Sequence, residues 1–408
     1  MRKILFIICD GLGDRPSAEL NGLTPLQAAK KPNIDRIAAN AMQGVIYTIS
    51  PGTVPGSDTS HLTLLGYNPE KVYTGRGPLE AVGAGVEMKA GDVAFRCNFA
   101  TVDERGVVKD RRAGRIKEPE TAELASLLQG IEIGEHRLTF KESTEHRCVL
   151  VIHGSGLGAN VTDTDPGVEG KAILQAEGKD TSSQQTAEIL NKFMSMVRTR
   201  FENADVNKKR VAKGLPPANA VLARGAGVFP EIEQFKEKTG MRMAAIAAEG
   251  LIVGICKVLG AKVYSPPGYT AGMDSNLENV ASTAEKLLRE NDMVFIHVKP
   301  TDVAGHDGNP IGKKEVIEKV DRMIGDMSNF IENDIVLAMT GDHSTPASAK
   351  EHTCDPVPLL IYGHGFRSDG IASFDEISSA KGSLSGLEGR SLLPLLMGYA
   401  DRSPKYGA

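Results

Sequence analysis

The sequence predicts an α/β protein: a mostly parallel sheet core with helices on both faces, plus a smaller inserted α+β domain. Short apolar runs alternate with helical patterns near both ends of the chain, and this rhythm is typical of a parallel sheet. The rhythm breaks in the middle, and 408 residues exceed one ordinary hydrophobic core. We therefore place a core domain at 1–75 and 240–408, and an inserted domain at 76–239.

The first elements of the core follow from apolar spacing. A buried strand is expected at 3–9, where an apolar run ends in Asp10. A helix is expected at 32–42, because apolar residues recur there on one helical face. The segment 50–66 is rich in glycine and proline at its start and predicts a loop that leads into an apolar helix.

The apolar patterns that predict helices and strands are weaker in the inserted domain than in the second half of the core. In the insert we expect strands at 93–99 and 147–153 and helices at 119–129 and 181–201. After residue 240 the alternation resumes with an apolar stretch and helix at 243–259, a strand at 292–298, a helix at 313–331, and strands at 335–339 and 358–362. These strands complete the predicted parallel sheet.

Composition excludes several classes of protein. Hydrophobic residues make up 41% and charged residues 24% of the chain, as in globular proteins, and the net charge of −5 offers no footprint for nucleic acid. No apolar run is long enough to span a membrane, and the N-terminal apolar run is too short for a signal peptide. Five scattered cysteines without a C-x-x-C pair favour the reducing cytoplasm. The sequence does not indicate an oligomeric state.

Acidic and histidine side chains follow three separate strands of the predicted sheet. Ligand sites in parallel sheets form beyond the carboxyl ends of the strands, so these side chains are expected to meet. They are Asp10 after 3–9, Asp302 and His306 after 292–298, Asp342 and His343 after 335–339, and His352 before 358–362. Oxygen and imidazole ligands without thiolates suit Mn²⁺, Mg²⁺, Zn²⁺ or Co²⁺.

Each of these residues alone has a simpler explanation. An aspartate after a strand is usually a helix cap, and a single histidine is more often a loop residue or a satisfied hydrogen-bonding group. Their joint placement favours a metal site over those explanations. We assign His297 a structural role because it lies in mid-strand, and His61 and His364 a packing or surface role.

Several motifs resemble the archaeal-type, cofactor-independent phosphoglycerate mutases of the alkaline phosphatase superfamily, in order and over nearly the whole chain. They are DG at 10–11, GSDTSHL at 56–62, TDVAGHDG at 301–308, GDHSTP at 341–346 and HTCDPVP at 352–358. The similarity extends through GLGDRP at 11–16, TPLQAA at 24–29 and DRRAGR at 110–115. The resemblance implies an alkaline-phosphatase-like core and a two-metal phosphoryl-transfer site.

The resemblance also implies roles for the metal ligands. One divalent cation would be held by Asp302, His306 and His352, and the other by Asp10, Asp342, His343 and the nucleophile Ser57. Mn²⁺ is the expected cation, with Mg²⁺, Co²⁺ and Zn²⁺ open, and no 2,3-bisphosphoglycerate is required. Coordination to a dication lowers the pKa of a serine hydroxyl and makes it a nucleophile. Thr59 and Ser60 are rival nucleophiles, and Ser57 could instead only cap a helix.

The inserted domain supplies candidates for binding the anionic substrate. Arginine binds carboxylate and phosphate through two parallel hydrogen bonds, although any single arginine is more often part of a solvated basic face. The arginine candidates are Arg96, Arg111, Arg112, Arg115 and Arg224. The resemblance adds Asp163, Asp165, His153 and Lys257 as substrate-binding candidates. Hinges near 75–78 and 238–240 are expected to let the inserted domain close over the substrate.

Five alternatives stand beside a mutase that interconverts 2-phosphoglycerate and 3-phosphoglycerate in glycolysis and gluconeogenesis. A metal-dependent phosphomonoesterase, a phosphopentomutase-like enzyme or a phosphonate hydrolase would share the metal site. A sulfatase is disfavoured because the loop at 57–61 lacks the proline and arginine that its cysteine or serine needs. A module that only binds a structural cation leaves the hydroxyl-rich loop unexplained.

Overall fold

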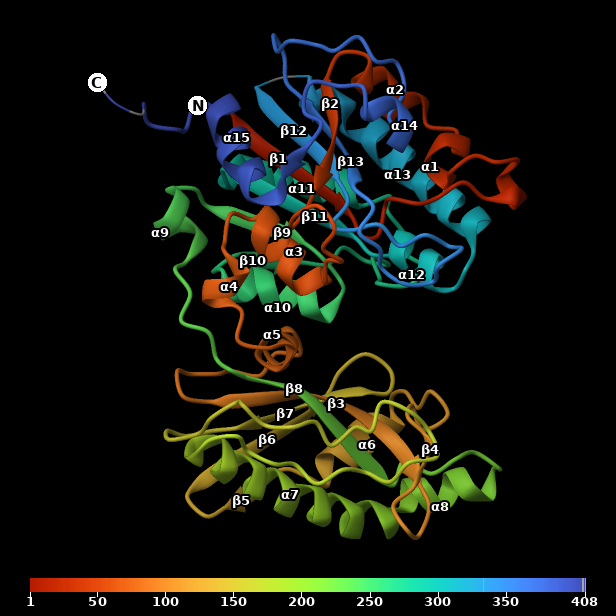
Figure 1. Ribbon diagram of the computed structural model, residues 1–408, viewed down its shortest axis with the longest axis vertical. Coiled ribbons are helices and arrows are strands. Elements are labelled where there is room, and N and C mark those ends of the chain that lie inside the picture. The colour runs from red at the N-terminus through yellow and green to blue at the C-terminus, as the bar shows by residue number, and fades with distance from the viewer. Residues whose placement is uncertain (333, 406, 408) are drawn as a thin grey trace. The chain divides into compact units, whose positions relative to one another are not determined.

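The chain folds into two compact units in the computed structural model, which describes every residue except 333, 406 and 408 (Figure 1). The first unit comprises Met1–Lys71 and Glu233–Ala408, and the second comprises Val72–Ile232. The domain limits that we predicted at 75/76 and 239/240 lie a few residues C-terminal to the limits in the structure, which are 71/72 and 232/233. Gly75 and Gly77 pack within the second unit, where an added Cβ would meet the carbonyl oxygens of Ala226 and Ala94, each at 2.2 Å.

An eight-stranded sheet forms the centre of the first unit, and most of its pairings are parallel. Its strands, in spatial order, are β10 (Lys262–Tyr264), β9 (Met243–Ile246), β11 (Met293–Val298), β1 (Lys3–Cys9), β12 (Ile335–Thr340), β13 (Val357–Tyr362), β2 (Met42–Tyr47) and β14 (Leu387–Glu388). β13 alone runs antiparallel to its neighbours. In the centre, Cys9 lies opposite Val298 and Ile8 opposite Thr340, so β1, β11 and β12 end level at one edge.

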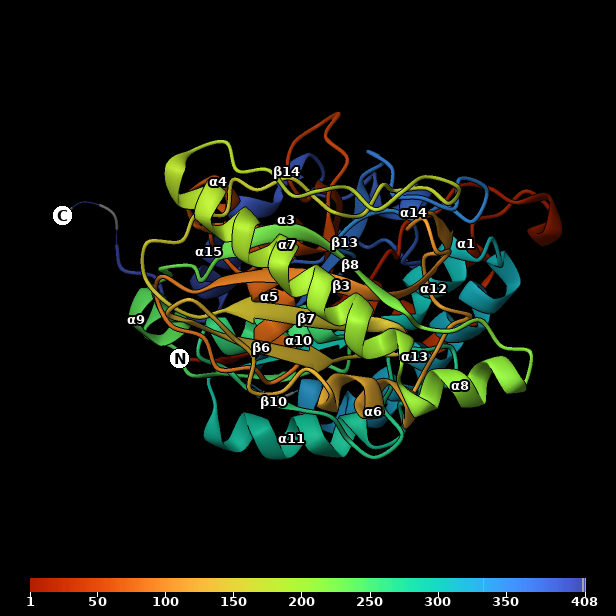
Figure 2. The same ribbon diagram turned by 90° about the horizontal axis from the view of Figure 1, so that it is seen from below.

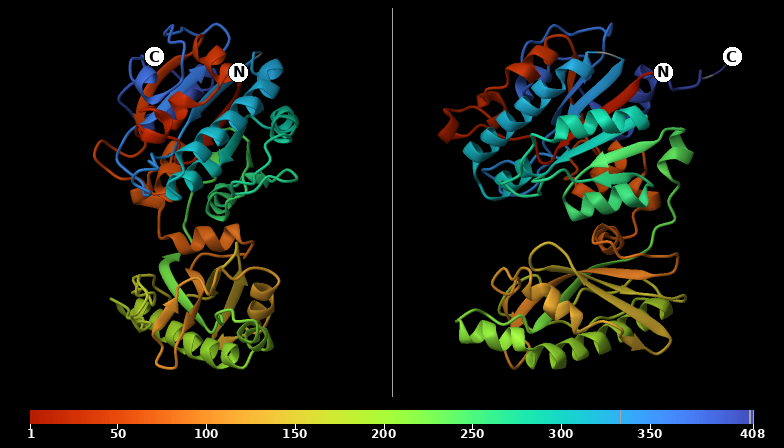
Figure 3. Two further views of the ribbon diagram at one scale, coloured as in Figure 1. Left: turned by 90° about the vertical axis from the view of Figure 1, so that its right-hand side faces the viewer. Right: turned by 180° about the vertical axis from the view of Figure 1, so that it is seen from behind.

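Helices cover both faces of this sheet. Leu5 and Ile7 of β1 join a buried cluster with residues of α2 (Pro32–Ala38), α11 (Val280–Glu290) and α13 (Pro310–Ile331). Phe6 points the other way and contacts Phe295, which in turn contacts the ring of His61 in α3 (Ser57–Leu64). α10 (Gly250–Val258) and α15 (Leu392–Tyr399) also belong to this unit, and two views show the layers on either side of the sheet (Figure 3). The predicted α/β core is thereby confirmed.

One local prediction was wrong. The helix expected at 32–42 ends at Ala38, because Met42 already pairs with Ile361 in the sheet and strand pairing overrides the helical spacing. The loop expected to lead into an apolar helix within 50–66 is confirmed, and the helix runs from Ser57 to Leu64. Shorter elements complete the chain: η1 (Ala18–Leu20), α1 (Pro25–Ala28), α4 (Pro69–Val72), α9 (Phe235–Thr239), α12 (Pro300–His306), α14 (Glu376–Ser379) and η2 (Gly389–Ser391).

The second unit is an antiparallel sheet with helices on both faces. Its strands are β3 (Val93–Val102), β4 (Val108–Asp110), β5 (Glu132–Ile133), β6 (His136–Glu142), β7 (Arg147–Ile152) and β8 (Ala220–Val228). α5 (Arg76–Gly83) packs on one face, and α6 (Glu120–Ser126) and α7 (Thr181–Glu202) pack on the other. Figure 2 shows α7 lying across this sheet, and α8 (Asp205–Ala212) follows it along the chain. The predicted α+β insert is confirmed.

Two observations bear on the surroundings of the protein. Within the described part of the chain, no helix is both long enough and apolar enough to cross a membrane. The five cysteines are free thiols; four are buried and Cys354 is exposed.

Candidate metal centre

Two groups of metal-ligating side chains lie beyond the carboxyl ends of β1, β11 and β12. The level ends of these parallel strands bring their following residues together, as the sequence predicts. The groups are Asp302, His306 and His352, and Asp10, Asp342 and His343. Within each group the ligand atoms all lie within 4.8 Å of one another. All six metal-ligand candidates from the sequence are therefore placed in one of two compact sets.

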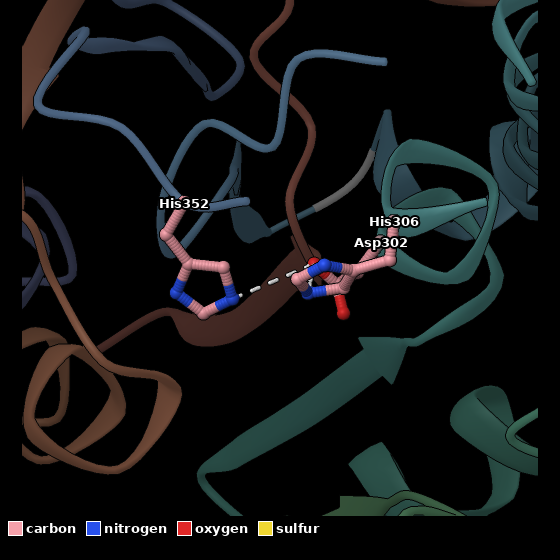
Figure 4. Close-up of side chains that lie close together, drawn as sticks. All are labelled: Asp302, His306 and His352. Carbon is pink, nitrogen blue, oxygen red and sulfur yellow. Dashed lines mark ion pairs between the residues drawn. The ribbon is translucent and has the colours of Figure 1, made fainter. Parts of the chain in front are cut away.

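The first group joins the helix α12 to a distant loop (Figure 4). One helical turn separates Asp302 from His306, and Asp302 Oδ1 lies 3.4 Å from His306 Nε2 and 3.8 Å from His352 Nε2. The other ring nitrogens donate to backbone carbonyls, His306 Nδ1 to Lys350 at 2.8 Å and His352 Nδ1 to Pro55 at 2.9 Å. Both histidines therefore present an unprotonated Nε2 when neutral, the form that binds a metal.

The second group contains buried carboxylate oxygens that lack well-aligned partners. Asp342 Oδ1 accepts hydrogen bonds from the backbone N–H groups of Gly11 at 2.9 Å and His343 at 3.0 Å. Among the described residues, no group donates a well-aligned hydrogen bond to Asp342 Oδ2 or Asp10 Oδ1. His343 Nε2 faces both, at 3.1 and 3.4 Å. A buried carboxylate oxygen without a partner is costly, and a divalent cation would satisfy both oxygens.

Ser57 is the hydroxyl that the fold directs toward the second group. It begins α3, is buried, and its Oγ lies 3.1 Å from His343 Nε2. The rival hydroxyls face backbone instead, since Thr59 Oγ1 and Ser60 Oγ donate to the carbonyl of Gly56 at 3.2 and 2.8 Å. The helix cap is Gly56, so Ser57 is not explained as a cap.

Lys299 is a central residue of the site that the sequence analysis missed. Its ammonium donates to Asp10 Oδ2 at 3.1 Å and to Asp302 Oδ2 at 2.6 Å, and so joins the two groups. Burial alone lowers the pKa of Lys299, but the two aspartates outweigh it and raise that pKa. The centre thus holds three carboxylates and one ammonium, which binds Asp10 and Asp302, and it keeps a negative surplus that suits cations. The signal in the sequence was a lysine one helical turn before Asp302.

Two histidines assigned to packing also contact the carboxylates. His297 Nε2 lies 2.8 Å from Asp10 Oδ2, and His61 Nδ1 lies 3.4 Å from Asp342 Oδ2 and 2.6 Å from the carbonyl oxygen of Ser57. Burial lowers the pKa of His61, which favours its neutral form. His297 reaches the site although it belongs to a strand, because it lies only one residue before the end of β11.

The second unit holds a cluster of arginines around two carboxylates. Its members are Arg76, Arg96, Arg111, Arg147 and Arg224, with Glu80 and Asp165. Arg111 binds Asp165 through two hydrogen bonds of 3.0 and 2.6 Å. Arg96 Nε lies 3.3 Å from Glu80, and Arg224 Nε lies 3.9 Å from Asp165. Arg76 and Arg147 were not predicted; Arg76 stands one helical turn from Glu80, which was the available signal.

This arginine cluster carries a positive surplus. Arg96 and Arg224 lie opposite each other on β3 and β8. Burial, reinforced by neighbouring arginines, lowers the pKa of Arg96 to about 10 and also lowers that of Arg224. Among the described residues, no group accepts a well-aligned hydrogen bond from the buried Nε of either. Two guanidinium groups with spare donors are suited to bind an anion.

The remaining substrate-binding candidates lie elsewhere. His153 Nδ1 lies 2.9 Å from Asp92 Oδ2, and His153 Nε2 lies 2.8 Å from Thr139 Oγ1. Asp163 is exposed and accepts a hydrogen bond from the backbone of Gly225 at 3.0 Å. Two of the arginines and the lysine are exposed: Arg112 and Arg115 in the turn after β4, and Lys257 on α10 of the first unit. For these residues a role in substrate binding stays a prediction.

Comparison with known proteins gives one consistent family. The profile of the 2,3-bisphosphoglycerate-independent phosphoglycerate mutases matches residues 38–207. Proteins with that name from Methanocaldococcus jannaschii and Sulfurisphaera tokodaii are each 46% identical, and each alignment covers 100% of this chain and 99% of the relative.

Solved structures agree with these relatives. The cofactor-independent phosphoglycerate mutase from Thermoplasma acidophilum is 38% identical with a TM-score of 0.74, over 98% of this chain and 100% of that one. The PH0037 protein from Pyrococcus horikoshii is also 38% identical, with a TM-score of 0.89 over 100% of this chain and 99% of that one. The chain therefore belongs to the family of 2,3-bisphosphoglycerate-independent phosphoglycerate mutases.

Proposed function

We propose that this protein interconverts 2-phosphoglycerate and 3-phosphoglycerate, in glycolysis and gluconeogenesis, through a phosphoserine at Ser57. The observation that carries the proposal is the position of Ser57 Oγ, 3.1 Å from His343 Nε2 and beside carboxylate oxygens without well-aligned partners. The names of the full-length relatives support the substrate and the independence from 2,3-bisphosphoglycerate.

Two divalent cations belong to this proposal. Asp302, His306 and His352 would hold one; Asp10, Asp342, His343 and Ser57 Oγ would hold the other. Bound there, the cations supply positive charge that favours ionisation of the serine hydroxyl and offsets the charge of the phosphoryl group. Mn²⁺ is the cation that we propose, and the same oxygen and nitrogen donors also suit Mg²⁺, Co²⁺ and Zn²⁺.

The chain's own residues perform the covalent step. Ser57 Oγ forms a bond to phosphorus, the bond from phosphorus to the glycerate oxygen breaks, and the serine proton passes in net terms to that oxygen. The glycerate then reorients, and the oxygen of its other hydroxyl forms a bond to phosphorus while the bond from phosphorus to Ser57 Oγ breaks. The proton of that hydroxyl returns in net terms to Ser57 Oγ. His61 lies 2.6 Å from the carbonyl oxygen of Ser57 and helps to fix the start of α3.

A mutase differs from a phosphatase in keeping the glycerate and excluding water. The arginine cluster suits the first task, because Arg96 and Arg224 have donors to spare for a carboxylate or phosphate. The first unit thus supplies phosphoryl transfer, and the second supplies anchoring of the anionic substrate. Free thiols on all five cysteines fit the cytoplasm, where we propose that the enzyme works.

The test is product analysis with 3-phosphoglycerate in the absence of 2,3-bisphosphoglycerate, with Mn²⁺ or with a chelator. We expect 2-phosphoglycerate by ³¹P NMR with Mn²⁺ and no turnover with the chelator. Mass spectrometry of the trapped enzyme should find phosphate on the peptide that contains Ser57. Release of inorganic phosphate instead would identify a phosphomonoesterase, and turnover of a pentose phosphate alone would identify a phosphopentomutase-like enzyme.

A further inference from the structure

Thr345 is a fully buried residue whose hydroxyl touches one member of each ligand group. Its Oγ1 lies 2.7 Å from Asp302 Oδ1 and 3.0 Å from His343 Nδ1. We propose that Thr345 is a positioning residue that couples the two cation sites, because one hydroxyl orients a ligand of each. The inference rests on the proposed two-cation site and adds a residue with no assigned role to it.

The direction of both hydrogen bonds follows from counting protons. A carboxylate only accepts, so the single hydroxyl proton of Thr345 goes to Asp302. The oxygen of Thr345 must then accept from His343, which places a proton on Nδ1 of the imidazole. A neutral His343 therefore keeps its lone pair on Nε2, the atom that faces Asp342, Asp10 and Ser57. The hydroxyl thus selects the metal-binding tautomer of His343.

The same hydroxyl aims the carboxylate of the other group. Asp302 Oδ1 is the oxygen that faces His306 Nε2 at 3.4 Å and His352 Nε2 at 3.8 Å. A hydrogen bond from Thr345 uses one lone pair of Oδ1 and leaves the other for a cation. Lys299 also contacts both groups, but it binds the opposite oxygen of Asp302, Oδ2.

Four neighbouring residues hold Thr345 in place. Its N–H donates to the carbonyl of Gly13 at 3.1 Å, and its own carbonyl accepts from the buried Lys313 Nζ at 3.0 Å. A Cβ added at Gly11 would lie 2.6 Å from Thr345 Oγ1, and one added at Gly305 would lie 2.9 Å from its methyl carbon. These contacts fix the position of the hydroxyl within the fold.

The ligand histidine His306 makes the contrast clear. Its Nδ1 donates to the carbonyl of Lys350. His352 donates to the carbonyl of Pro55 and also stacks on the ring of His343, with ring centroids 3.5 Å apart. Loss of the His306 contact would therefore disturb the first site alone. Loss of the Thr345 hydroxyl would free the tautomer of His343 and the orientation of Asp302 together, so both cations should bind less tightly.

The experiment titrates Co²⁺ into chelator-stripped protein by calorimetry and visible absorption. Thr345→Val keeps the shape and removes the hydroxyl; we expect both binding steps to weaken about tenfold or more, as for other residues that orient metal ligands. Thr345→Ser keeps the hydroxyl and should bind both cations almost as the unmodified protein does. Thr340→Val is the matched control, because that buried hydroxyl donates to the carbonyl of Pro358 at 2.8 Å and touches neither group.

Four results would overturn the inference. Two cations bound by Thr345→Val with unchanged affinity would refute the coupling alone, whereas fewer than two cations bound by the unmodified protein would also refute the proposed site. Weakening by Thr345→Ser as severe as that by Thr345→Val would assign the effect to packing. Should Thr345→Val not fold, long-range ¹H–¹⁵N spectra of the Zn²⁺-loaded unmodified protein decide: a proton on Nδ1 of His343 supports the inference, and its absence overturns it.

Discussion

The two units of this protein carry uncompensated charges of opposite sign. The edge of the parallel sheet holds the carboxylates of Asp10, Asp302 and Asp342, and the ammonium of Lys299 donates to the first two. Within the described part of the chain, Asp10 Oδ1 and Asp342 Oδ2 accept no well-aligned hydrogen bond. On the antiparallel sheet, five arginines surround Glu80 and Asp165. The buried Nε atoms of Arg96 and Arg224 have no well-aligned acceptor among the residues that the structure describes.

This comparison indicates that the sign of the surplus charge in each unit predicts the charge of the ligand that binds there. Buried charge without a counterion is unstable, so each unit must receive a partner of the opposite sign to reach full stability. Carboxylates at converging strand ends require cations, and arginines spread across a strand face require anions. The proposed transfer of a phosphoryl group on an acidic substrate would use both charges.

The largest expected effect comes from the group that joins the covalent step. Ser57→Ala should lower kcat by about 10⁴-fold or more, because removal of a nucleophile leaves only binding and electrostatic contributions. Activity with 3-phosphoglycerate and mass spectrometry of the trapped enzyme measure it. Ser60→Ala is the matched control, since its hydroxyl donates to the carbonyl of Gly56. Phosphorylation at another residue in Ser57→Ala would refute the assignment.

Substitution of one carboxylate in the first unit tests whether that unit binds two cations. Asp342→Asn keeps the shape but removes the charge beside His343, and we expect one of two Co²⁺ ions to be lost and kcat to fall about 10³-fold. Calorimetry and activity measurements check both. Asp307→Asn, an exposed acidic residue beside the site, serves as control and should bind two ions. Normal cation binding by Asp342→Asn would contradict the proposed ligand set.

A substitution in the second unit should weaken substrate binding without changing cation binding. Arg224→Ala removes a charged donor from the arginine cluster, and loss of such a hydrogen bond, about 1.5–3 kcal/mol, corresponds to a fall of roughly 10- to 100-fold in kcat/KM. Co²⁺ affinity should not change. Arg105→Ala is the control, an exposed arginine outside the cluster. An equal loss in both arginine variants would mean that the cluster does not bind the substrate.

The smallest expected effect contrasts two glutamates. Burial raises the pKa of Glu376 to about 7 from an ordinary value of 4.5. Its folded state therefore binds a proton more tightly than the unfolded chain does, and this stabilisation, present below pH 4.5, is lost as pH rises through about 7. Glu376→Gln mimics the protonated form, so it should be more stable than the unmodified protein at pH 8, by about 1–3 kcal/mol.

Glu80 provides the opposite case. Burial alone would raise its pKa, but Arg96 and Arg76 outweigh burial and lower it. Glu80→Gln should therefore be less stable than the unmodified protein at pH 7, and the difference should shrink as pH falls below 4.5, the ordinary value. Urea unfolding midpoints across this pH range measure both variants. The same sign of pH dependence for the two would refute the charge comparison.

The sequence was informative where local pattern and strand order coincide. Strand 3–9 and the strands after residue 290 are nearly continuous apolar runs, which is typical of strands buried on both faces, so their ends and the acidic residues behind them could be located. The helix expected at 32–42 was too long because apolar spacing cannot register the pairing of Met42 with Ile361, more than 300 residues away.

Residue types and strand order by themselves predicted the fold class and six candidate metal ligands, and the resemblance to a known family implied the chemistry of the site. The tertiary structure decided what depends on contacts between distant segments. It placed Lys299 between two aspartates, His297 against Asp10, Thr345 between the two ligand groups, and Arg76 and Arg147 beside Glu80. Single lysines, threonines and arginines are common in any sequence, and only their neighbours in space distinguish a functional one from a surface one.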